Sequence, residues 1–377
     1  MTKIINRNLF QTIKQQCFKG KTIIVIGPRQ VGKSTMLLAV AQTFPNYLFL
    51  DGDDSFVRQQ LTNPNFQALK QIIGEYKVVF IDEAQRIENI GLTLKMIHDR
   101  MKDVQLLVSG SSPLDISNEM NEPLTGRKFE YRMFPVSWEE WQQHNDYLTV
   151  QQQLEDRLLY GMYPDVLNRV GDEENILRQL LESYLYKDIL MLTGIKKPEV
   201  LEKLVQALGL QIGNEVSYNE LSQLVEADKN TIASYIDLLE KAFVIFRLPS
   251  FSKNLRNEIK TNKKIYFYDN GIRNAVINNF NPISMRQDKG ALWENFIISE
   301  RMKFLSYHQH HVKTYFWRTK QQQEVDYLEV KATKISAYEI KWKSSAKVKV
   351  PPAFAASYKA DFNVIDRDNF TNFVVKN

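Results

Sequence analysis

Apolar residues in the first third of the chain follow two alternating spacings. Short β-rich apolar runs occupy residues 21–26, 47–50, 77–82 and 104–108. Between the first two runs, Met36, Leu37, Val40 and Ala41 recur at helical spacing over residues 34–44. Uninterrupted apolar strands that alternate with helices are typical of a parallel sheet covered by helices on both faces. The pattern therefore predicts a doubly wound α/β domain over residues 21–110.

A different pattern begins after Lys197. It predicts helices at 198–210, 217–227 and 231–243, then a short strand at 244–248. Ser217 and Glu220 have the spacing of a capping box at the start of the second helix. Two short helices around a tight turn, followed by a strand, indicate a winged helix-turn-helix. The alternative is a packing or partner-binding module, because Asp237 and Glu240 on the third helix oppose phosphate binding.

Composition narrows the class of protein. The 377 residues contain 49 Lys and Arg against 44 Asp and Glu, a net charge of +5 that permits contact with nucleic acid without requiring it. A single cysteine, Cys17, excludes an internal disulfide framework and a Cys-cluster zinc site. No apolar run approaches the roughly 18 residues that span a bilayer, and the N-terminus lacks a signal-peptide core. We expect a multidomain cytoplasmic protein with no membrane partner.

The first apolar run leads directly into a glycine-rich loop, GPRQVGKST, that opens the following helix. Two glycines let the backbone curl so that its N–H groups point at phosphate oxygens, and the helix N-terminus adds positive potential. Lys33 supplies a cation for the β- and γ-phosphates, and the Ser34 hydroxyl suits Mg²⁺. The candidate nucleotide-binding residues are Gly27, Pro28, Arg29, Gln30, Val31, Gly32, Lys33, Ser34 and Thr35. The pattern predicts an ATP site.

Two further strand ends belong with this loop. The run KVVFIDEAQ ends in Asp82, a candidate for the Mg²⁺ shell, and Glu83, a candidate to polarise the attacking water. Another strand ends in Ser109, Gly110 and two more serines, and Ser109 is a candidate γ-phosphate sensor. The alternative for Ser109 is an ordinary polar turn.

The C-terminal third holds a second group of candidate residues. Glu294 lies in a predicted helix, Asp326 follows a strand, and Glu339 and Lys341 are two apart on another strand, so they share a face. Carboxylate oxygens suit Mg²⁺, and a lysine beside them can assist a metal-bound water. Glu329 and Lys331 form a competing pair, but regular alternation would turn Asp326 and Glu329 to opposite faces. The alternative is charges that protect an edge strand.

Together, the segments GPRQVGKST, IDEAQ, SGSS and LTGR make the chain resemble a prokaryotic group of AAA-type P-loop ATPases. The resemblance implies a helical lid and an arginine finger, for which Arg127 is the first candidate and Arg132 the second. The C-terminal residues resemble the restriction-endonuclease-like PD-(D/E)XK fold, which the same group is expected to carry. Asp326, Glu339 and Lys341 are the residues that match.

The resemblance implies an α/β chain of four parts. They are an AAA-type ATPase core at 1–135, a helical lid at 136–197, a winged helix at 198–262 and a restriction-endonuclease-like domain at 263–377. Expected cofactors are ATP and Mg²⁺. DNA or RNA is the expected partner of the C-terminal site, and a second copy or a regulatory protein is a further candidate. The alternative to cleavage is a regulatory ATP switch that binds DNA or protein without cutting.

Overall fold

The computed structural model describes residues 4–111, 123–183, 197–252, 263–344 and 348–376. The chain forms two compact units. One comprises Lys3–Val136 with Lys241–Phe243, and the other Ser137–Glu240 with Val244–Asn377. Among the residues just given, no helix has both the length and the apolar character needed to cross a membrane.

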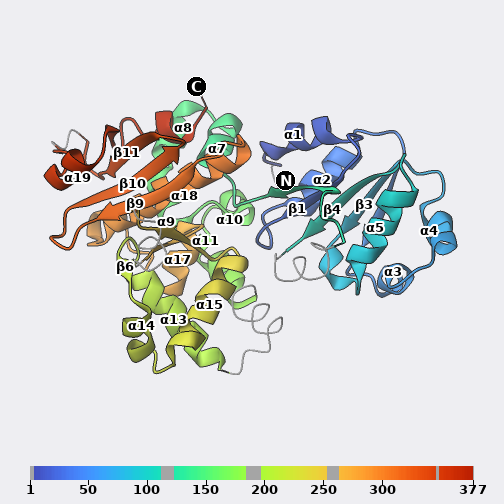
Figure 1. Cartoon of the computed structure of the whole chain (residues 1–377), viewed down its shortest axis with the longest axis horizontal. Helices are drawn as coiled ribbons and strands as arrows, with labels where there is room; N and C mark the ends of the chain where they lie inside the picture. Colours follow the sequence, from blue (N-terminus) through green and yellow to red (C-terminus); the bar gives the residue numbers. More distant parts are fainter. Residues whose placement is uncertain (1–3, 112–122, 184–196, 253–262, 345–347, 377) are drawn as a thin grey trace. The chain divides into compact units, whose positions relative to one another are not determined.

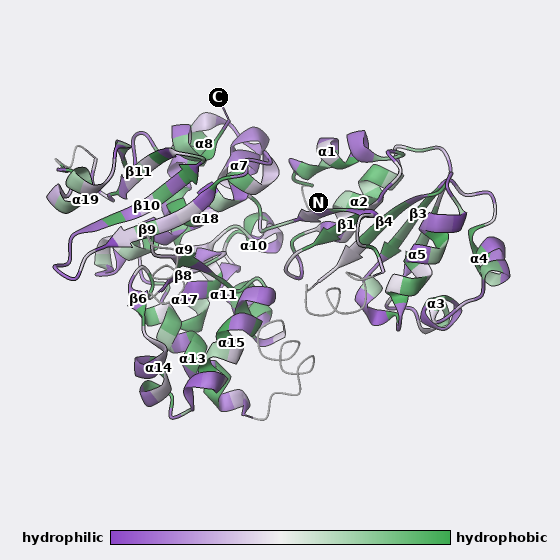
Figure 2. Cartoon of the chain, in the orientation of Figure 1, coloured by the Kyte–Doolittle hydropathy of each residue, from purple (hydrophilic) through white to green (hydrophobic). Residues whose placement is uncertain are grey.

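A five-stranded parallel sheet forms the centre of the first unit (Figure 1). Its strand order is β2 (Tyr47–Asp51), β3 (Val78–Asp82), β4 (Gln105–Gly110), β1 (Thr22–Ile26) and β5 (Lys128–Arg132). Every pair in the sheet is parallel, so the carboxyl ends of all five strands meet at one edge. Every residue of β1, β3 and β4 is buried, and Figure 2 shows these strands as hydrophobic. The predicted α/β fold is confirmed.

Helices cover this sheet and connect its strands. They are α1 (Leu9–Gln16), α2 (Lys33–Ala41), α3 (Ser55–Leu61), α4 (Phe66–Ile73) and α5 (Ile90–Arg100), with the short turn η1 (Ala84–Arg86). The four apolar residues predicted to line α2 are all buried. Strand β5 was not predicted from the apolar pattern, because its side chains are only partly buried and alternate with exposed ones.

The second unit begins with five short helices. They are α7 (Trp138–His144), α8 (Tyr147–Gln152), α9 (Leu154–Tyr160), α10 (Pro164–Asn168) and α11 (Glu173–Leu180). Both α9 and α11 pack against α17 (Asn270–Val276), which lies far along the sequence. These helices fall in the segment predicted as a lid, whose residues 184–196 lie outside the described part of the chain. The helices are grouped with the second unit, and the predicted domain boundaries stay predictions.

Three helices and a three-stranded antiparallel sheet follow. The helices are α13 (Pro198–Leu210), α14 (Tyr218–Leu224) and α15 (Lys229–Lys241). The sheet has the order β6 (Glu215–Val216), β8 (Lys263–Phe267) and β7 (Ile245–Pro249). Ser217 caps α14 by accepting a hydrogen bond from the Glu220 N–H at 3.5 Å, as half of the predicted capping box requires.

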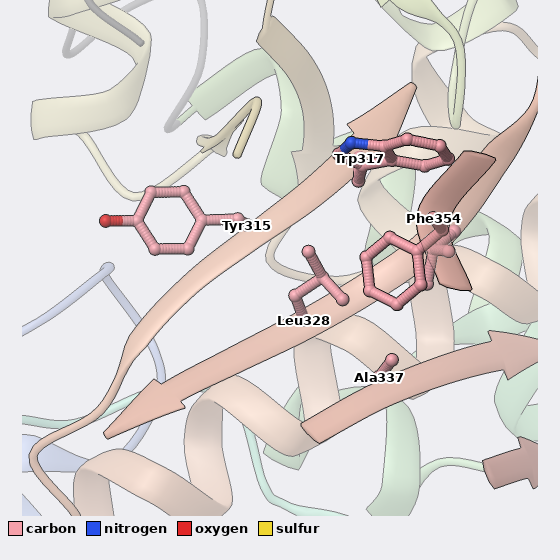
Figure 3. Close-up of a cluster of buried hydrophobic side chains, with 6 residues drawn as sticks. Tyr315, Trp317, Leu328, Ala337 and Phe354 are labelled. Carbon is pink, nitrogen blue, oxygen red and sulfur yellow. The ribbon is translucent and has the colours of Figure 1, made fainter. Parts of the chain in front are cut away.

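The chain ends in a four-stranded mixed sheet. After η3 (Ile283–Met285), helix α18 (Lys289–Tyr307) is followed by β9 (Lys313–Arg318), β10 (Glu324–Lys331), β11 (Lys334–Ile340), α19 (Pro352–Ser357), β12 (Ala360–Ile365) and α20 (Thr371–Val374). The strand order is β12, β11, β10, β9, with β12 parallel to β11 and the other pairs antiparallel. On one face, Trp317, Leu328 and Ala337 lie near Phe354 of α19, and Tyr315 extends the same cluster farther along β9 (Figure 3).

Strand β10 is irregular near its start. Its pairing with β9 shifts register between Val325 and Leu328, and both of these residues belong to the cluster beneath α19. The shift lets Asp326 and Glu329 lie on the other face, where Glu329 binds Arg301 of α18 at 2.7 Å. The prediction that Asp326 and Glu329 lie on opposite faces is therefore wrong, because it assumed an unbroken alternation.

Candidate functional sites

Two glycines determine the conformation of the loop between β1 and α2. Gly32, which precedes α2, has a φ of 91°, a left-handed conformation that favours glycine. A Cβ atom on Gly27 would lie 2.0 Å from the carbonyl oxygen of Met133, so no side chain fits there. Helix α2 starts without a side-chain cap, which leaves its first turn available to an anion. We call residues 27–35 the phosphate loop.

Lys33 is the buried cation of the phosphate loop. Its side chain is 4% exposed, and its Nζ donates to the carbonyl oxygens of Gly27 at 2.9 Å and Pro28 at 2.8 Å. Burial lowers the pKa of Lys33 from 10.5 to about 8, although the nearby carboxylates of Glu83 and Asp82 act in the opposite direction. The hydrogen-bond acceptors of this ammonium group are uncharged carbonyl oxygens. A bound polyphosphate would replace them with negatively charged oxygens.

The predicted acidic and hydroxyl residues come together at the carboxyl edge of the sheet. Ser34 donates to Asp82 Oδ1 at 2.8 Å, and the Ser109 hydroxyl donates to the same oxygen. Ser109 also accepts a hydrogen bond from the Glu83 N–H at 3.1 Å. The register explains the meeting of Asp82 and Ser109, because the residues that precede them, Ile81 of β3 and Val108 of β4, lie side by side. The hydroxyl and carboxylate oxygens fit a Mg²⁺ ion that bridges to a nucleotide.

Glu83 is held by residues that the sequence reasoning missed. It has a left-handed backbone, with φ 44° and ψ 42°, and its Oε2 accepts a hydrogen bond from Gln85 Nε2 at 2.5 Å. The same Gln85 amide group donates to the Ser111 hydroxyl at 2.8 Å. Gln85 therefore orients the carboxylate that was predicted to polarise water. Its only signal in the sequence is its position two residues after Glu83.

Arg7 is a second residue that was missed. Its guanidinium donates to the Val31 carbonyl oxygen at 2.5 Å and to the Phe134 carbonyl oxygen at 2.7 Å. It therefore ties the phosphate loop to the segment that follows β5. Nothing local to MTKIINRNLF identifies this role, because the partners are 24 and 127 residues away.

The two arginine-finger candidates lie at different edges of the sheet. The Arg127 carbonyl accepts from the Thr22 N–H at 2.9 Å, which puts Arg127 at the start of β1, away from the phosphate loop. Its guanidinium pairs with Asp99 at 2.9 Å, and both side chains are partly exposed. Arg132, by contrast, lies beside Ile26 at the carboxyl edge and is exposed. Arg127 is not brought to the phosphate loop of its own chain.

The C-terminal candidates also meet. We call Glu294 of α18, Asp326 of β10 and Glu339 of β11, with Lys341, the C-terminal carboxylate site. Lys341 Nζ lies 2.6 Å from Glu339 Oε1 and 3.8 Å from Asp326 Oδ2. The Ile340 N–H donates to Asp326 Oδ2 at 2.8 Å, which fixes this carboxyl against the end of β11. The nearby carboxylates outweigh burial and raise the pKa of Lys341.

The electrostatics of this site favour an added cation. Burial, with the nearby charges of Glu294 and Glu339, raises the pKa of Asp326 from 3.8 to about 8. The Oε2 atom of Glu339 is buried without a hydrogen-bond partner. Oxygen donors of this kind suit Mg²⁺. Within the described ranges, however, no group of three or more His, Cys, Asp or Glu side chains is arranged to hold a metal ion.

Two residues of β8 enter the same site and were missed as site residues. Lys264 is 1% exposed and lies 3.1 Å from Glu294 Oε1 through its Nζ, which also pairs with Glu324. Tyr266 donates its hydroxyl to Glu294 Oε1 at 2.6 Å. Burial lowers the pKa of Lys264, but Glu294 and Glu324 outweigh it and raise the value overall. Hydropathy alone gives no signal here, since KKIYF reads as an ordinary strand.

Three family models match successive parts of the chain. Residues 19–142 match an AAA domain, residues 151–282 match a domain of unknown function (DUF8612), and residues 289–374 match another (DUF4143). The second match runs across the boundary predicted between the lid and the winged helix. The first match covers the phosphate loop and the strand ends that surround Asp82 and Ser109.

Two curated proteins and one solved structure are similar to longer parts of the chain. An uncharacterized protein of Haemophilus influenzae is 27% identical over 67% of this chain and 68% of its own length. An uncharacterized protein of Mycobacterium tuberculosis is 24% identical over 86% of this chain and 70% of its own. A Walker-type ATPase of Pyrococcus abyssi has the same fold, with a TM-score of 0.51 and 15% identity over 72% of this chain and 96% of that one. Residues 19–142 thus match an AAA domain, and the similarity to the Walker-type ATPase shows a shared fold.

Proposed function

We propose that this chain hydrolyses Mg²⁺·ATP at the phosphate loop and thereby controls a metal-dependent nucleic-acid-cleaving site in its C-terminal sheet. The observation that carries the second half is the meeting of Asp326, Glu339 and Lys341 on neighbouring strands. A helix, three strands, a helix and a fourth strand follow one another there, which is the order expected of a PD-(D/E)XK domain. The first half rests on the AAA-domain match and on the contacts of Asp82.

Each residue of the phosphate loop has a role in this proposal. Lys33 gives up its carbonyl partners to bind the β- and γ-phosphates, while Ser34 and Asp82 hold Mg²⁺. Glu83, oriented by Gln85, accepts a proton from the attacking water. Ser109 senses the γ-phosphate from the tip of β4. Arg127 is a candidate finger only for a neighbouring copy, so this role requires a homo-oligomer.

In the C-terminal carboxylate site, Asp326 and Glu339 provide oxygen ligands and Lys341 stabilises negative charge on the phosphate. A bound Mg²⁺ would lower the pKa of a water and neutralise charge in the transition state. The Ile340 N–H keeps Asp326 oriented toward the same point as Lys341. Glu329 is excluded from this role because Arg301 binds both of its oxygens, at 2.7 and 3.0 Å.

The region from α13 to β8 supports a winged-helix module that contacts DNA or RNA. The helices α14 and α15 precede β7 and β8, in the order expected of that fold. The acids that seemed to oppose phosphate binding are partly neutralised, because one cation, Arg247, pairs with Asp237 at 2.6 Å and also with Glu240. The alternative function is a regulatory ATP switch whose C-terminal part binds nucleic acid or a regulatory protein without cleavage.

Nicking of plasmid DNA by the intact chain with Mg²⁺ or Mn²⁺ tests this proposal. Cleavage should be lost in Glu339→Gln and Lys341→Ala. It should persist in Lys331→Ala, which alters the exposed lysine of the competing pair. If single- and double-stranded DNA and RNA stay intact with both metals, with and without ATP, the nuclease function is rejected. The regulatory ATP switch is then the remaining proposal.

ATP turnover is measured in the same preparation. Hydrolysis that disappears in Lys33→Ala supports the ATPase half of the proposal. An intact chain that binds ATP without hydrolysing it would reject turnover and leave a nucleotide-binding scaffold.

A further inference from the structure

Strand β8 reaches the C-terminal carboxylate site from a different sheet. It pairs with β6 and β7, not with any strand of the β9–β12 sheet. Lys264 and Tyr266 are two apart on this strand, so their side chains leave it on the same face. Both contact Glu294 Oε1, at 3.1 and 2.6 Å. One carboxylate of the site is therefore held by a neighbouring module.

The position of Lys264 is fixed on several sides. Its Nζ pairs with Glu294 and with Glu324, and it lies 5.6 Å from the centre of the Phe316 ring. The side chain is 1% exposed, so its charge has little access to water. A buried ammonium group loses much of its hydration energy and is retained only where carboxylates surround it. Lys264 therefore stays with Glu294 for as long as β8 stays in place.

An ammonium group and a divalent metal would compete for the same oxygen atoms. Two donors already bind Glu294 Oε1, whereas Glu339 Oε2 on the facing strand has no hydrogen-bond partner. The site thus has one occupied oxygen, Glu294 Oε1, and one open oxygen, Glu339 Oε2. A divalent ion that used all three carboxylates would have to bring its positive charge close to the Lys264 ammonium group.

We propose that Lys264 is an internal counter-ion which occupies Glu294 in place of a divalent metal, and that the metal binds tightly only when β8 withdraws it. This inference rests on the metal-dependent function proposed for the site. Because β8 is paired along its whole length with β7, a shift of that sheet would move Lys264 and Tyr266 together. The module that is proposed to contact nucleic acid would thereby control metal loading.

The experiment measures Mn²⁺ binding to the full chain by the loss of the free-ion signal in electron paramagnetic resonance. Lys264→Met keeps the length of the side chain and removes its charge, and we expect it to lower the Kd for Mn²⁺ at least about tenfold. Lys264→Arg keeps the charge and should bind Mn²⁺ like the wild type. Lys263→Met alters the neighbouring residue, which leaves the strand on the opposite face, and is the matched control.

A second variant protects the test against misfolding. Lys264→Met leaves Glu294 without Lys264 and leaves Glu324 with Arg318 alone, at 3.4 Å, whereas Lys264→Met combined with Glu324→Gln keeps the net charge of the wild type. The double variant should also bind Mn²⁺ at least about tenfold more tightly, and Mn²⁺ should raise its Tm more than that of the wild type.

The outcomes separate this inference from the function on which it rests. Equal Mn²⁺ affinity in the wild type and both Lys264→Met variants overturns the counter-ion role and leaves the proposed metal site intact. Absence of Mn²⁺ binding in every variant overturns both. Mn²⁺ binding that is tighter in the two Lys264→Met variants, and unchanged in Lys264→Arg and Lys263→Met, supports both the counter-ion role and the metal site.

Discussion

The phosphate loop and the C-terminal carboxylate site hold their charged groups by different means. In the phosphate loop, backbone geometry is dominant, and the one buried cation, Lys33, is held by two carbonyl oxygens. In the C-terminal carboxylate site, side chains from separate strands and a helix hold one another through ion pairs. A site built from one continuous segment forms with its local fold, whereas a site built from ion pairs depends on every segment that contributes to it.

The largest effect of a single substitution should be on ATP hydrolysis at the phosphate loop. We expect Glu83→Gln to reduce ATP turnover by about 10²–10⁴-fold, because the variant cannot accept a proton from water. Nucleotide affinity, measured by calorimetry with ADP, should stay within about threefold of the wild type, since backbone groups supply much of the binding. Glu88→Gln, at an exposed position on the same segment, is the control. A Glu83→Gln variant with wild-type turnover would remove Glu83 from the mechanism.

A glycine replacement tests how far the phosphate loop depends on its backbone. Gly27→Ala puts a Cβ 2.0 Å from the Met133 carbonyl oxygen and should destabilise the first unit by about 2–4 kcal/mol. Gly290→Ala is the matched control, because no atom lies within 4 Å of its added Cβ in helix α18. This control should gain about 0.5–1 kcal/mol. Thermal unfolding measures both, and an unchanged Tm in Gly27→Ala would contradict the close approach.

The C-terminal carboxylate site should make stability depend on pH. Asp326 has a folded pKa of about 8, above its ordinary 3.8, so between these values the folded state holds more protons than the unfolded state. Its contribution is complete below about 3.8 and is lost as pH rises toward 8. In EDTA, the wild type should lose up to about 1.4 kcal/mol per pH unit relative to Asp326→Asn across this window. Urea unfolding measures the free energy of unfolding of both proteins from pH 5 to 8. A difference between them that stays constant over this range would contradict the raised pKa of Asp326.

The smallest expected effect concerns nucleotide binding. Lys33 has a pKa of about 8 without nucleotide, and a bound polyphosphate favours its charged form, so binding takes up a proton above that pH. ADP affinity should therefore fall by up to about tenfold per pH unit above 8. Calorimetry from pH 7 to 9.5 measures this fall. Lys33→Met should bind ADP more weakly, and its affinity should not fall with pH in this way. If the ADP affinity of both proteins falls equally with pH, another group is responsible for the fall.

What the sequence could predict depends on how local each feature is. The phosphate loop and its helix lie within fifteen residues, and the apolar strands on either side of it establish the parallel sheet. Short apolar runs likewise predicted the strands at TYFWRT and AYEIKW, whereas β12 and the order of the four strands in the sheet were not predicted. Asp326, Glu339 and Lys341 could be selected because they follow those runs at recognisable spacing.

The residues that were missed are defined by distant partners. Arg7 contacts Phe134, and Lys264 contacts Glu294, yet neither pair shares a sequence pattern. For a related reason, the position of Arg127 was not predicted, and its role as a finger for a neighbouring copy stays a prediction. Its place in the sequence does not reveal that it precedes β5, and this alone puts it at the edge opposite the phosphate loop. Periodicity predicts elements, but it does not say which ends of them meet.

The register shift in β10 has a consequence for comparing this chain with its homologues. Because the shift puts Asp326 on the same face as Glu329, counting odd and even positions does not give the faces of these two acids. Loss of Tyr327 would remove the shift but leave Asp326 on this face, because the single residue between Val325 and Leu328 would still point away from the cluster beneath α19. In an alignment, a gap of one position at this point would therefore leave the two acids two positions apart on the same face, without loss of the site.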